Sequence, residues 1–384
     1  MEKNMSAKCQ KRQQSDHPGI DALVVVLSIV LTIALLAWML VNVGNGKIPQ
    51  AEDIPFGEKI DAYFGGQLDG IFNGEIPKKN IFRLNDGDMV APAPVPERYG
   101  QTDEPGTLQW LLDEADSLLD GQETLFSTQT AIKEKSIVYY YLDETIFAVT
   151  WKQVVDGGVY TFSEIKIGHP SQFRRFFSEN KYGSGRLYTT TEMSETVNAV
   201  VAASGDYYGY RSIGIVVNNG QIYRDRGHLL DTCYIDDNGD MLFTYAGEIT
   251  DMETLQQYVD ANHIRFSLSF GPVMIENGIN CVPNSYNSGE VNKDYARAAL
   301  CQLDRLHYVL VAANMENPYL SVPTVRKFAE NLLEIGIPRA YALDGGQTAA
   351  IAMDHQLMNT VSYGSQRKIS DIIYFATALP GPTG

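Results

Sequence analysis

The chain has 384 residues, of which 44% are hydrophobic and 20% charged. This composition excludes wholesale disorder, and the length allows one large domain or two smaller ones. The formal net charge of −17 argues against nucleic acid as a partner, because phosphate binding needs a basic surface. The four cysteines show neither CxxC pairs nor the spacing of a zinc site, so we expect no disulfide framework; pairing of Cys281 with Cys301 is the disfavoured alternative.

The N-terminal part has the pattern of a signal anchor. Residues 1–21 form a polar tail with four basic residues, and residues 22–43 are almost wholly apolar. About 20 such residues span a bilayer core. A cleaved signal peptide, the rival interpretation, has a shorter apolar region of about 7–15 residues. The basic tail predicts a cytoplasmic N-terminus, a single transmembrane helix over 22–43 and an extracytoplasmic remainder at the cell membrane.

Residues 44–105 are rich in glycine, proline and acidic residues, which predicts a stalk or spacer that extends to residue 129. Within it, Thr107 can cap a helix over 107–119 whose leucines share one face. We expect that helix to serve packing or dimerisation. The pattern then changes, and a single domain is predicted over 130–384.

The domain pattern mixes strands with helices. The expected strands have alternating or β-branched side chains, and the expected helices have a 3.6-residue period. Strands are predicted over 136–142, 146–151, 159–167, 307–313 and 339–343, and a hairpin turn at 218–220. Helices are predicted over 192–202 and 251–262, and a third has apolar residues from Val325 to Leu333 and Gly336 near its end. The prediction is an α+β fold with a mixed sheet and packed helices, without a dinucleotide or phosphate-loop motif.

Asp344 is the first candidate for chemistry. It follows the strand predicted at 339–343 and precedes Gly345 and Gly346. A buried strand that ends in an acid, followed by a backbone able to turn sharply, is how many sites present a reactive carboxylate. The alternative is a tight surface turn.

Residues 204–211, SGDYYGYR, form the second candidate. Asp206 lies beside Tyr207 and Tyr208, and Arg211 follows. Aromatic faces stack on sugars and acids bind hydroxyls, so this segment suits a carbohydrate pocket. A strand-end turn with surface tyrosines is the alternative.

Arg297 and Arg367 each precede an apolar run and lie on either side of the Asp344 turn in sequence. An arginine can clamp a phosphate through two charge-assisted hydrogen bonds, although a single arginine in this position is usually solvated. The six histidines show no metal-ligand spacing, and no GxSxG motif is present. A carboxylate mechanism assisted by arginine is therefore the chemistry these residues favour.

Taken in order, these motifs resemble the phosphodiester glycosidase family, whose members include bacterial exported proteins. The resemblance covers roughly residues 130–378. It is carried by SGDYYGYR (204–211), FGPVMIENG (270–278), ARAALCQ (296–302), ALDGGQTA (342–349) and SQRKISD (365–371). The sequence departs from the family pattern at Ser204, where the family usually has Asn, and at Cys301, where it usually has Gly. Gln347 and Thr348 replace the commoner Gly-Ser pair.

The resemblance implies an extracytoplasmic hydrolase of sugar-1-phosphodiesters in cell-wall polymer or exopolysaccharide metabolism. Asp344 would be base or nucleophile, and Asp206 would orient the sugar or supply a second carboxylate. The implied substrate-binding residues are Arg297, Arg367, Gly345, Gly346, Gln347, Thr348, Tyr207, Tyr208 and Arg211. No cofactor is expected, and a divalent cation at the two acids stays open.

A non-catalytic protein that binds a glycan phosphate or assists assembly is the alternative, and Ser204 is the feature that favours it. Loss of the usual Asn amide removes a group able to orient a ligand. A structural membrane-tethered spacer would not explain the ordered set of motifs.

Overall fold

The computed structural model describes residue 9 and residues 83–85, 88, 90–128, 137–287, 290–316 and 321–379. The chain divides into two compact units, Met1–Cys9 with Phe82–Gly384 and Gln10–Ile81. Every described residue belongs to the first unit. The predicted anchor at 22–43 lies outside the described residues, and among these no helix is both long and apolar enough to cross a membrane.

A nine-stranded antiparallel sheet forms the centre of the described unit, in the order β1-β2-β3-β4-β15-β14-β16-β12-β13. Its strands are β1 (Tyr99–Thr102), β2 (Val138–Leu142), β3 (Ile146–Val155), β4 (Gly158–Ile167), β12 (Val273–Glu276), β13 (Ile279–Asn280), β14 (Arg297–Asp304), β15 (His307–Asn314) and β16 (Arg339–Leu343). β14 lies between β15 and β16, so the strands predicted at 307–313 and 339–343 are not neighbours in the sheet.

Two five-stranded antiparallel sheets complete the strand layers. The first has the order β10-β9-β11-β7-β8, with β7 (Gly214–Asn218), β8 (Gln221–Arg226), β9 (Thr232–Asp236), β10 (Met241–Thr244) and β11 (Ile264–Leu268). The second has the order β18-β17-β6-β19-β5, with β5 (Phe173–Phe177), β6 (Val201–Ser204), β17 (Ile351–Met353), β18 (Gln356–Leu357) and β19 (Asp371–Phe375).

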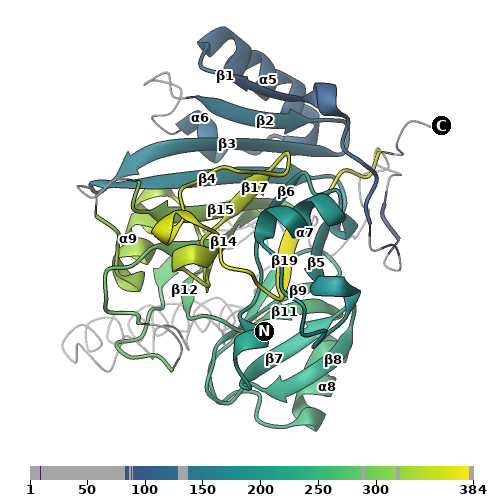
Figure 1. The fold of residues 1–384 in the computed structure, drawn as a ribbon, viewed down its shortest axis with the longest axis vertical. Coiled ribbons are helices and arrows are strands. Elements are labelled where there is room, and N and C mark those ends of the chain that lie inside the picture. The colour runs from purple at the N-terminus through teal and green to yellow at the C-terminus, as the bar shows by residue number, and fades with distance from the viewer. Residues whose placement is uncertain are drawn as a thin grey trace, which may run out of the picture. The chain divides into compact units, whose positions relative to one another are not determined.

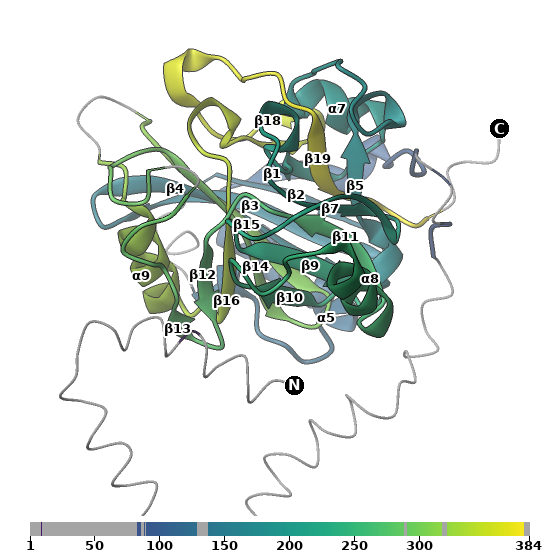
Figure 2. The same cartoon turned by 90° about the horizontal axis from the view of Figure 1, so that it is seen from below.

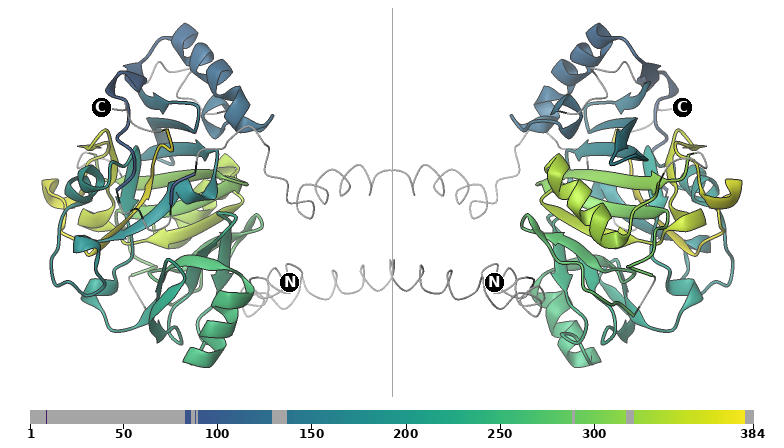
Figure 3. Two further views of the ribbon diagram at one scale, coloured as in Figure 1. Left: turned by 90° about the vertical axis from the view of Figure 1, so that its right-hand side faces the viewer. Right: turned by 90° about the vertical axis from the view of Figure 1, so that its left-hand side faces the viewer.

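Helices cover the outer faces of these sheets. They are α5 (Pro105–Leu119), α6 (Leu125–Thr128), α7 (Thr190–Thr196), α8 (Met252–Ala261) and α9 (Val325–Ile335). α5 and α9 pack on the large sheet, α7 on the β5–β6–β19 sheet and α8 on the β7–β9–β11 sheet. Figure 1 shows α5 beside β1 and β2 at one end of the unit and α8 at the other. In Figure 2, α9 and α8 lie on opposite sides of the stacked strands, and Figure 3 shows α9 lying along the large sheet.

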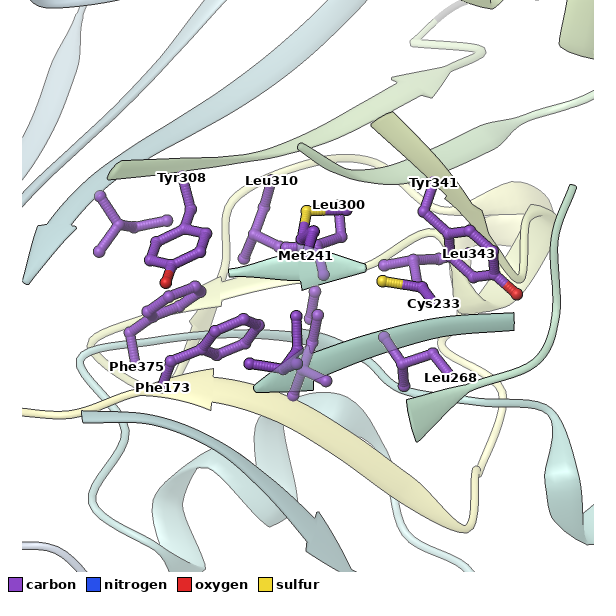
Figure 4. Close-up of a cluster of buried hydrophobic side chains, with 14 of the residues drawn as sticks. Phe173, Cys233, Met241, Leu268, Leu300, Tyr308, Leu310, Tyr341, Leu343 and Phe375 are labelled. Atoms are coloured by element: carbon purple, nitrogen blue, oxygen red, sulfur yellow. The ribbon is translucent and has the colours of Figure 1, made fainter. Parts of the chain in front are cut away.

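The main core lies between the large sheet and the two smaller ones. Tyr308 and Leu310 of β15 face Phe173 of β5 and Phe375 of β19, and the two phenyl rings stack at 4.3 Å between centroids (Figure 4). All four side chains are fully buried. Burial of each such side chain stabilises the fold by roughly 1.5–3 kcal/mol. This core holds the ends of all three sheets in fixed positions.

Most of the predicted elements are present. The strands at 307–313 and 339–343, the helices at 251–262 and 325–335 and the hairpin turn at 218–220 all form. The helix predicted over 192–202 is wrong in its second half. α7 ends at Thr196, and residues from Val201 belong to β6, because Ala202 and Ala203 pair with β17 and β19 on either side.

The predicted domain boundary at residue 130 is too late. β1 belongs to the large sheet, and α5 buries Leu108, Leu111 and Ala115 against it. Leu84 is buried beside α7 as well. The described part of the predicted spacer is therefore part of the domain. The N-terminal cap is also corrected, since α5 begins at Pro105 and Thr107 lies inside it.

A disulfide joins Cys9 to Cys281, whereas Cys233 and Cys301 are free and buried. The expectation that Cys281 does not pair with Cys301 is confirmed, and the Cys9–Cys281 pair is one that the sequence analysis did not consider. A disulfide requires both cysteines in one compartment.

Candidate active site

The three sheets meet at a small pocket. The end of β6, the end of β16 and the segment before β19 supply its lining, which consists of Ser204, Gly205, Asp206, Tyr207, Tyr210, Asp344, Thr348, Ile369 and Ser370. The pocket leaves no room for a water molecule in this structure. The two predicted acids, Asp206 and Asp344, are thus brought together from positions 138 residues apart in the chain.

Asp344 follows β16 as predicted, and its side chain is 15% exposed. Burial raises the pKa of Asp344 to about 6, against opposing effects of the Thr348 hydroxyl and of Arg367 and Arg211. Its Oδ2 atom is buried and has no hydrogen-bond partner in the described part of the chain. A carboxyl with a free oxygen and a pKa near neutrality is able to accept a proton from a reactant.

Arg367 and two tyrosines form the mouth of the pocket. Arg367 Nη1 lies 4.0 Å from Asp344 Oδ2, and its guanidinium lies 6.0 Å from the Tyr207 ring and 5.9 Å from the Tyr210 ring. The two rings stack at 4.8 Å, and the Tyr210 hydroxyl donates to the Lys368 carbonyl at 2.5 Å. Arg367 is 39% exposed, so it is available to an anion that enters from solvent.

Asp206 differs from Asp344 because both of its carboxylate oxygens are engaged. Oδ1 accepts from Arg211 Nη2 at 2.5 Å, and Oδ2 accepts from the Ser269 backbone N–H at 3.1 Å. Arg211 also donates to the Ser269 carbonyl at 2.6 Å and lies 5.4 Å from the Phe270 ring. Asp206 therefore fixes Arg211 and the end of β11, and it has little capacity left for a substrate.

Two fully buried residues, Arg175 and Asp371, contact Asp206 on its buried side. Neither was singled out by the sequence analysis. Arg175 Nε donates to Asp371 Oδ2 at 2.8 Å, and its Nη2 lies 3.8 Å from Asp206 Oδ2. Asp371 Oδ2 in turn accepts from the Asp206 backbone N–H at 3.0 Å. Burial and the charge of Asp206 raise the pKa of Asp371 to about 6, although Arg175 opposes this. Asp371 lies within the quoted SQRKISD segment, but Arg175, in FRRFF, has the pattern of a core strand.

Gly205 is required by this arrangement. A Cβ atom at this position would lie 2.4 Å from Asp371 Oδ2, so any side chain would displace the carboxylate. Gly346 has φ of +66°, and a Cβ atom there would lie 2.8 Å from the Tyr295 ring. Gly205, which precedes Asp206, and Gly346, the second residue after Asp344, thus permit close packing around the pocket.

The other predicted binding residues occupy varied positions. Thr348 lines the pocket and its hydroxyl donates to the Gly345 carbonyl at 2.6 Å. Gln347 donates from Nε2 to the Ser365 carbonyl at 3.1 Å. The backbone carbonyl of Gln347 accepts from the backbone N–H of Arg367 at 3.2 Å, which links Arg367 to the Asp344 turn. Tyr208 is buried beneath the site, 5.5 Å from the Arg175 guanidinium, so it supports Arg175 and does not face the pocket mouth.

Arg297 is not brought to this pocket. Its guanidinium donates to the backbone carbonyls of Pro323 at 3.2 Å, Glu290 at 2.8 Å and Lys293 at 2.5 Å. Burial lowers its pKa to about 10. It lines a neighbouring pocket with Phe270, and its contacts assign it to holding two loops together.

The two departures from the family pattern lie in different places. Ser204 lines the pocket, and its Oγ atom is buried without a hydrogen-bond partner among the described residues. Cys301 is buried in β14 on the face that packs against α9, away from the pocket. Within the described residues, no group of three potential ligands has the arrangement of a metal site.

Comparison with known proteins identifies a class that agrees with these motifs. Residues 196–376 match the family described as phosphodiester glycosidase. That range contains Asp206, Arg211, Asp344, Arg367 and Asp371, whereas Arg175 precedes it. No curated protein matches the chain.

Among solved structures, the chain resembles the catalytic domain of zebrafish N-acetylglucosamine-1-phosphodiester alpha-N-acetylglucosaminidase, auto-inhibited by its pro-peptide. The TM-score is 0.50 at 14% identity, over 61% of this chain and 84% of that one. It also matches a hypothetical protein from Synechocystis (TM-score 0.42, 13% identity, 60% and 62% of the two chains). A third match is a putative exported protein from Burkholderia pseudomallei (TM-score 0.37, 12% identity, 57% of this chain and 74% of that one). At 14% identity, the zebrafish comparison establishes a shared fold.

Proposed function

We propose that the domain is a hydrolase that cleaves the bond between C1 of a sugar and the oxygen of a phosphodiester. The observation that carries this proposal is the state of Asp344. It has a buried oxygen that accepts no hydrogen bond from the described residues and a pKa of about 6, and it faces Arg367 within the range that matches phosphodiester glycosidases.

The surroundings of Asp344 suit this substrate. Arg367 would bind the phosphodiester through charge-assisted hydrogen bonds, and the Tyr207–Tyr210 pair offers an aromatic face to the sugar. A phosphate monoester leaves as an anion, so its departure does not require a strong acid. One reacting carboxylate can therefore suffice.

The contacts of Asp206 favour a division of roles. Its oxygens bind Arg211 and the Ser269 N–H, so we assign it to positioning. Asp344 is assigned the general base that takes a proton from the attacking water. Ionised above pH 6, it can accept that proton at neutral pH. The pocket must widen to admit substrate and water, since it has no room for a water molecule in this structure.

Product stereochemistry tests this assignment. The full-length protein would be incubated with UDP-N-acetylglucosamine and a panel of sugar-1-phosphodiesters, and the first anomer formed would be followed by NMR. A base that activates water gives inversion, whereas an attacking carboxylate gives retention. Sugar release that falls by about 10²–10⁴ in Asp344→Asn locates the base. Retention would reassign Asp344 as the nucleophile, and unchanged turnover in the variant would remove Asp344 from the mechanism.

A non-catalytic glycan-phosphate-binding protein is the second candidate. The unpaired Ser204 hydroxyl, at a position where the resemblance predicts an amide, and the closed pocket favour it. Ser204→Asn separates the two candidates. A large gain of sugar release in this variant would show that the natural site has lost activity, and no gain alongside an active wild type would support the enzyme.

We also propose that the domain acts outside the cytoplasm, at the cell membrane and on a cell-surface glycan. The Cys9–Cys281 disulfide supports an oxidising compartment. The alternative is the predicted single span at 22–43 with a cytoplasmic N-terminus. That arrangement would keep Cys9 away from Cys281, so it excludes the disulfide.

A further inference from the structure

Several exposed basic side chains outside the pocket region are paired with acids. Arg98 lies 3.0 Å from Glu144, Lys152 lies 3.3 Å from Glu316, and Lys293 lies 2.6 Å from Glu290. Such pairing is expected in a chain with a net charge of −17. In so acidic a chain, basic residues that gather beside the pocket indicate the charge of its ligand.

Three such residues lie beside the pocket. Lys181, Arg186 and Lys368 are exposed, and none forms an ion pair within the described part of the chain. Lys368 is close enough to Glu192 to contribute to the lowered pKa of that acid, after the hydrogen bonds from Thr189. Together with Arg367, they form what we call the basic rim.

Hydrogen bonds join the basic rim to the pocket mouth. Tyr188 and Ile369 exchange two backbone hydrogen bonds of 3.1 and 2.7 Å, which places the segment that carries Arg186 beside the segment that carries Lys368. The Tyr210 hydroxyl holds the Lys368 carbonyl at 2.5 Å. The Arg186 carbonyl accepts from Ser178 Oγ at 2.6 Å, at the end of β5. The rim thus continues from Arg367 along residues 181–188.

Tyrosines accompany these charges. At the mouth, Tyr210 is 42% exposed and stacks on Tyr207. Further along, Tyr182 stacks on Tyr208 at 5.0 Å and contacts Tyr223 at 5.0 Å, and Tyr223 is 36% exposed. Aromatic faces bind sugar rings, whereas lysine and arginine bind phosphates. A surface that offers both matches a ligand in which sugars alternate with phosphates.

We infer that the substrate is a polymer of sugars linked through phosphates, and that the basic rim and its tyrosines bind the repeats adjacent to the one in the pocket. This inference rests on the proposed function. The positive charges of the basic rim counter the repulsion between an acidic protein and an anionic polymer. A small sugar-1-phosphodiester with one phosphate would reach only Arg367.

The length dependence of binding tests the inference. Synthetic N-acetylglucosamine-1-phosphate oligomers with one to four phosphates would be titrated against the full-length protein at 50 and 200 mM salt. We expect affinity to rise about tenfold from one to four phosphates at low salt and the gain to shrink at high salt. Lys181→Gln combined with Arg186→Gln should abolish this gain.

The matched control is Arg98→Gln combined with Lys152→Gln, which removes the same two charges from ion-paired surface positions. It should keep the gain. Inorganic tetraphosphate, which offers charge without sugars, should bind more weakly than the four-phosphate oligomer. Equal binding of the two, absence of a gain in the wild type, or the same loss in both double variants would each overturn the inference. Hydrolysis of the one-phosphate compound by the wild type reports separately on the proposed function.

Discussion

Asp344, Asp206 and Asp371 lie close together, yet their contacts differ. Asp206 and Asp371 accept hydrogen bonds from Arg211, Arg175 and backbone N–H groups, whereas Asp344 keeps one oxygen unpaired. A buried carboxyl without full compensation is a source of instability, and such groups are common at functional sites. The acid that the fold stabilises least is therefore the one we assign to the chemistry.

The raised pKa of Asp344 predicts a pH-dependent gain of stability in Asp344→Asn. Below its ordinary pKa of 3.8, Asp344 is protonated in both the folded and unfolded states, and its contribution to stability is fully present. The contribution is lost as pH rises through about 6, because ionisation is then easier in the unfolded state. The variant should exceed the wild type by up to about 3 kcal/mol at pH 8 and match it near pH 4.

Urea denaturation of both proteins at the two pH values measures this difference. Asp103→Asn, which removes an exposed acid, controls for the change in net charge. A variant that is less stable than the wild type at pH 8 would show that Asp344 is a stabilising structural residue.

Sequence patterns pointed to the acids that line the pocket but not to Arg175, which contacts Asp206 on its buried side. Asp344 and Asp206 stand out because each adjoins glycine in a motif. Arg175 could not be found in this way, since it lies in an aromatic strand and reaches Asp371 only because β5 pairs with β19. Arg297 was predicted to bind substrate, but it does not line the pocket. Its position in the chain does not reveal that its guanidinium donates to the Pro323 and Glu290 carbonyls.

At the level of elements, local patterns predicted those whose signals are complete within a few residues. The β7–β8 hairpin has Asn219 and Gly220 with positive φ at its turn, and α8 has Asp251 as its N-cap. The second half of the helix predicted over 192–202 failed for a physical reason. Alanines favour helix, but pairing with strands on both sides outweighs that preference in β6.

The packing of α5 yields a prediction about the segment that its composition assigned to a spacer. Leu111 is fully buried against the large sheet, so Leu111→Ala should lower the free energy of unfolding by about 2–5 kcal/mol. Glu114→Ala, on the exposed face of the same helix, should change it by less than about 0.5 kcal/mol. Chemical denaturation of the two variants gives the free energies of unfolding. Equally small changes in both would show that α5 belongs to the spacer and not to the domain.

At the scale of the whole molecule, the site depends on the convergence of three sheets. Asp206 follows β6, Asp344 follows β16 and Arg211 binds the end of β11, and each strand belongs to a different sheet. Strand order cannot be read from a sequence when paired strands are far apart in the chain, as β14 and β16 are. The α+β class was therefore predictable, but the arrangement that makes the pocket was not.

The Cys9–Cys281 disulfide predicts that residue 9 shares a compartment with the domain. Thiols would be blocked in intact cells and the protein digested without reduction. Mass spectrometry should then find the two cysteine peptides linked. Cys233 and Cys301, whose thiol pKa values are raised by burial, should react only after unfolding. An alkylated Cys9 peptide in unreduced protein would contradict the disulfide and restore the single-span arrangement with a cytoplasmic tail.

The most direct test of the central claim is hydrolysis of a sugar-1-phosphodiester in water enriched in ¹⁸O, followed by the mass of the phosphate product. Attack of water at C1 leaves every phosphate oxygen in place, so we predict a phosphate monoester without ¹⁸O, produced by the wild type and not by Asp344→Asn. Incorporation of ¹⁸O into the phosphate would mean that water attacks phosphorus. That result would contradict a glycosidase mechanism at Asp344.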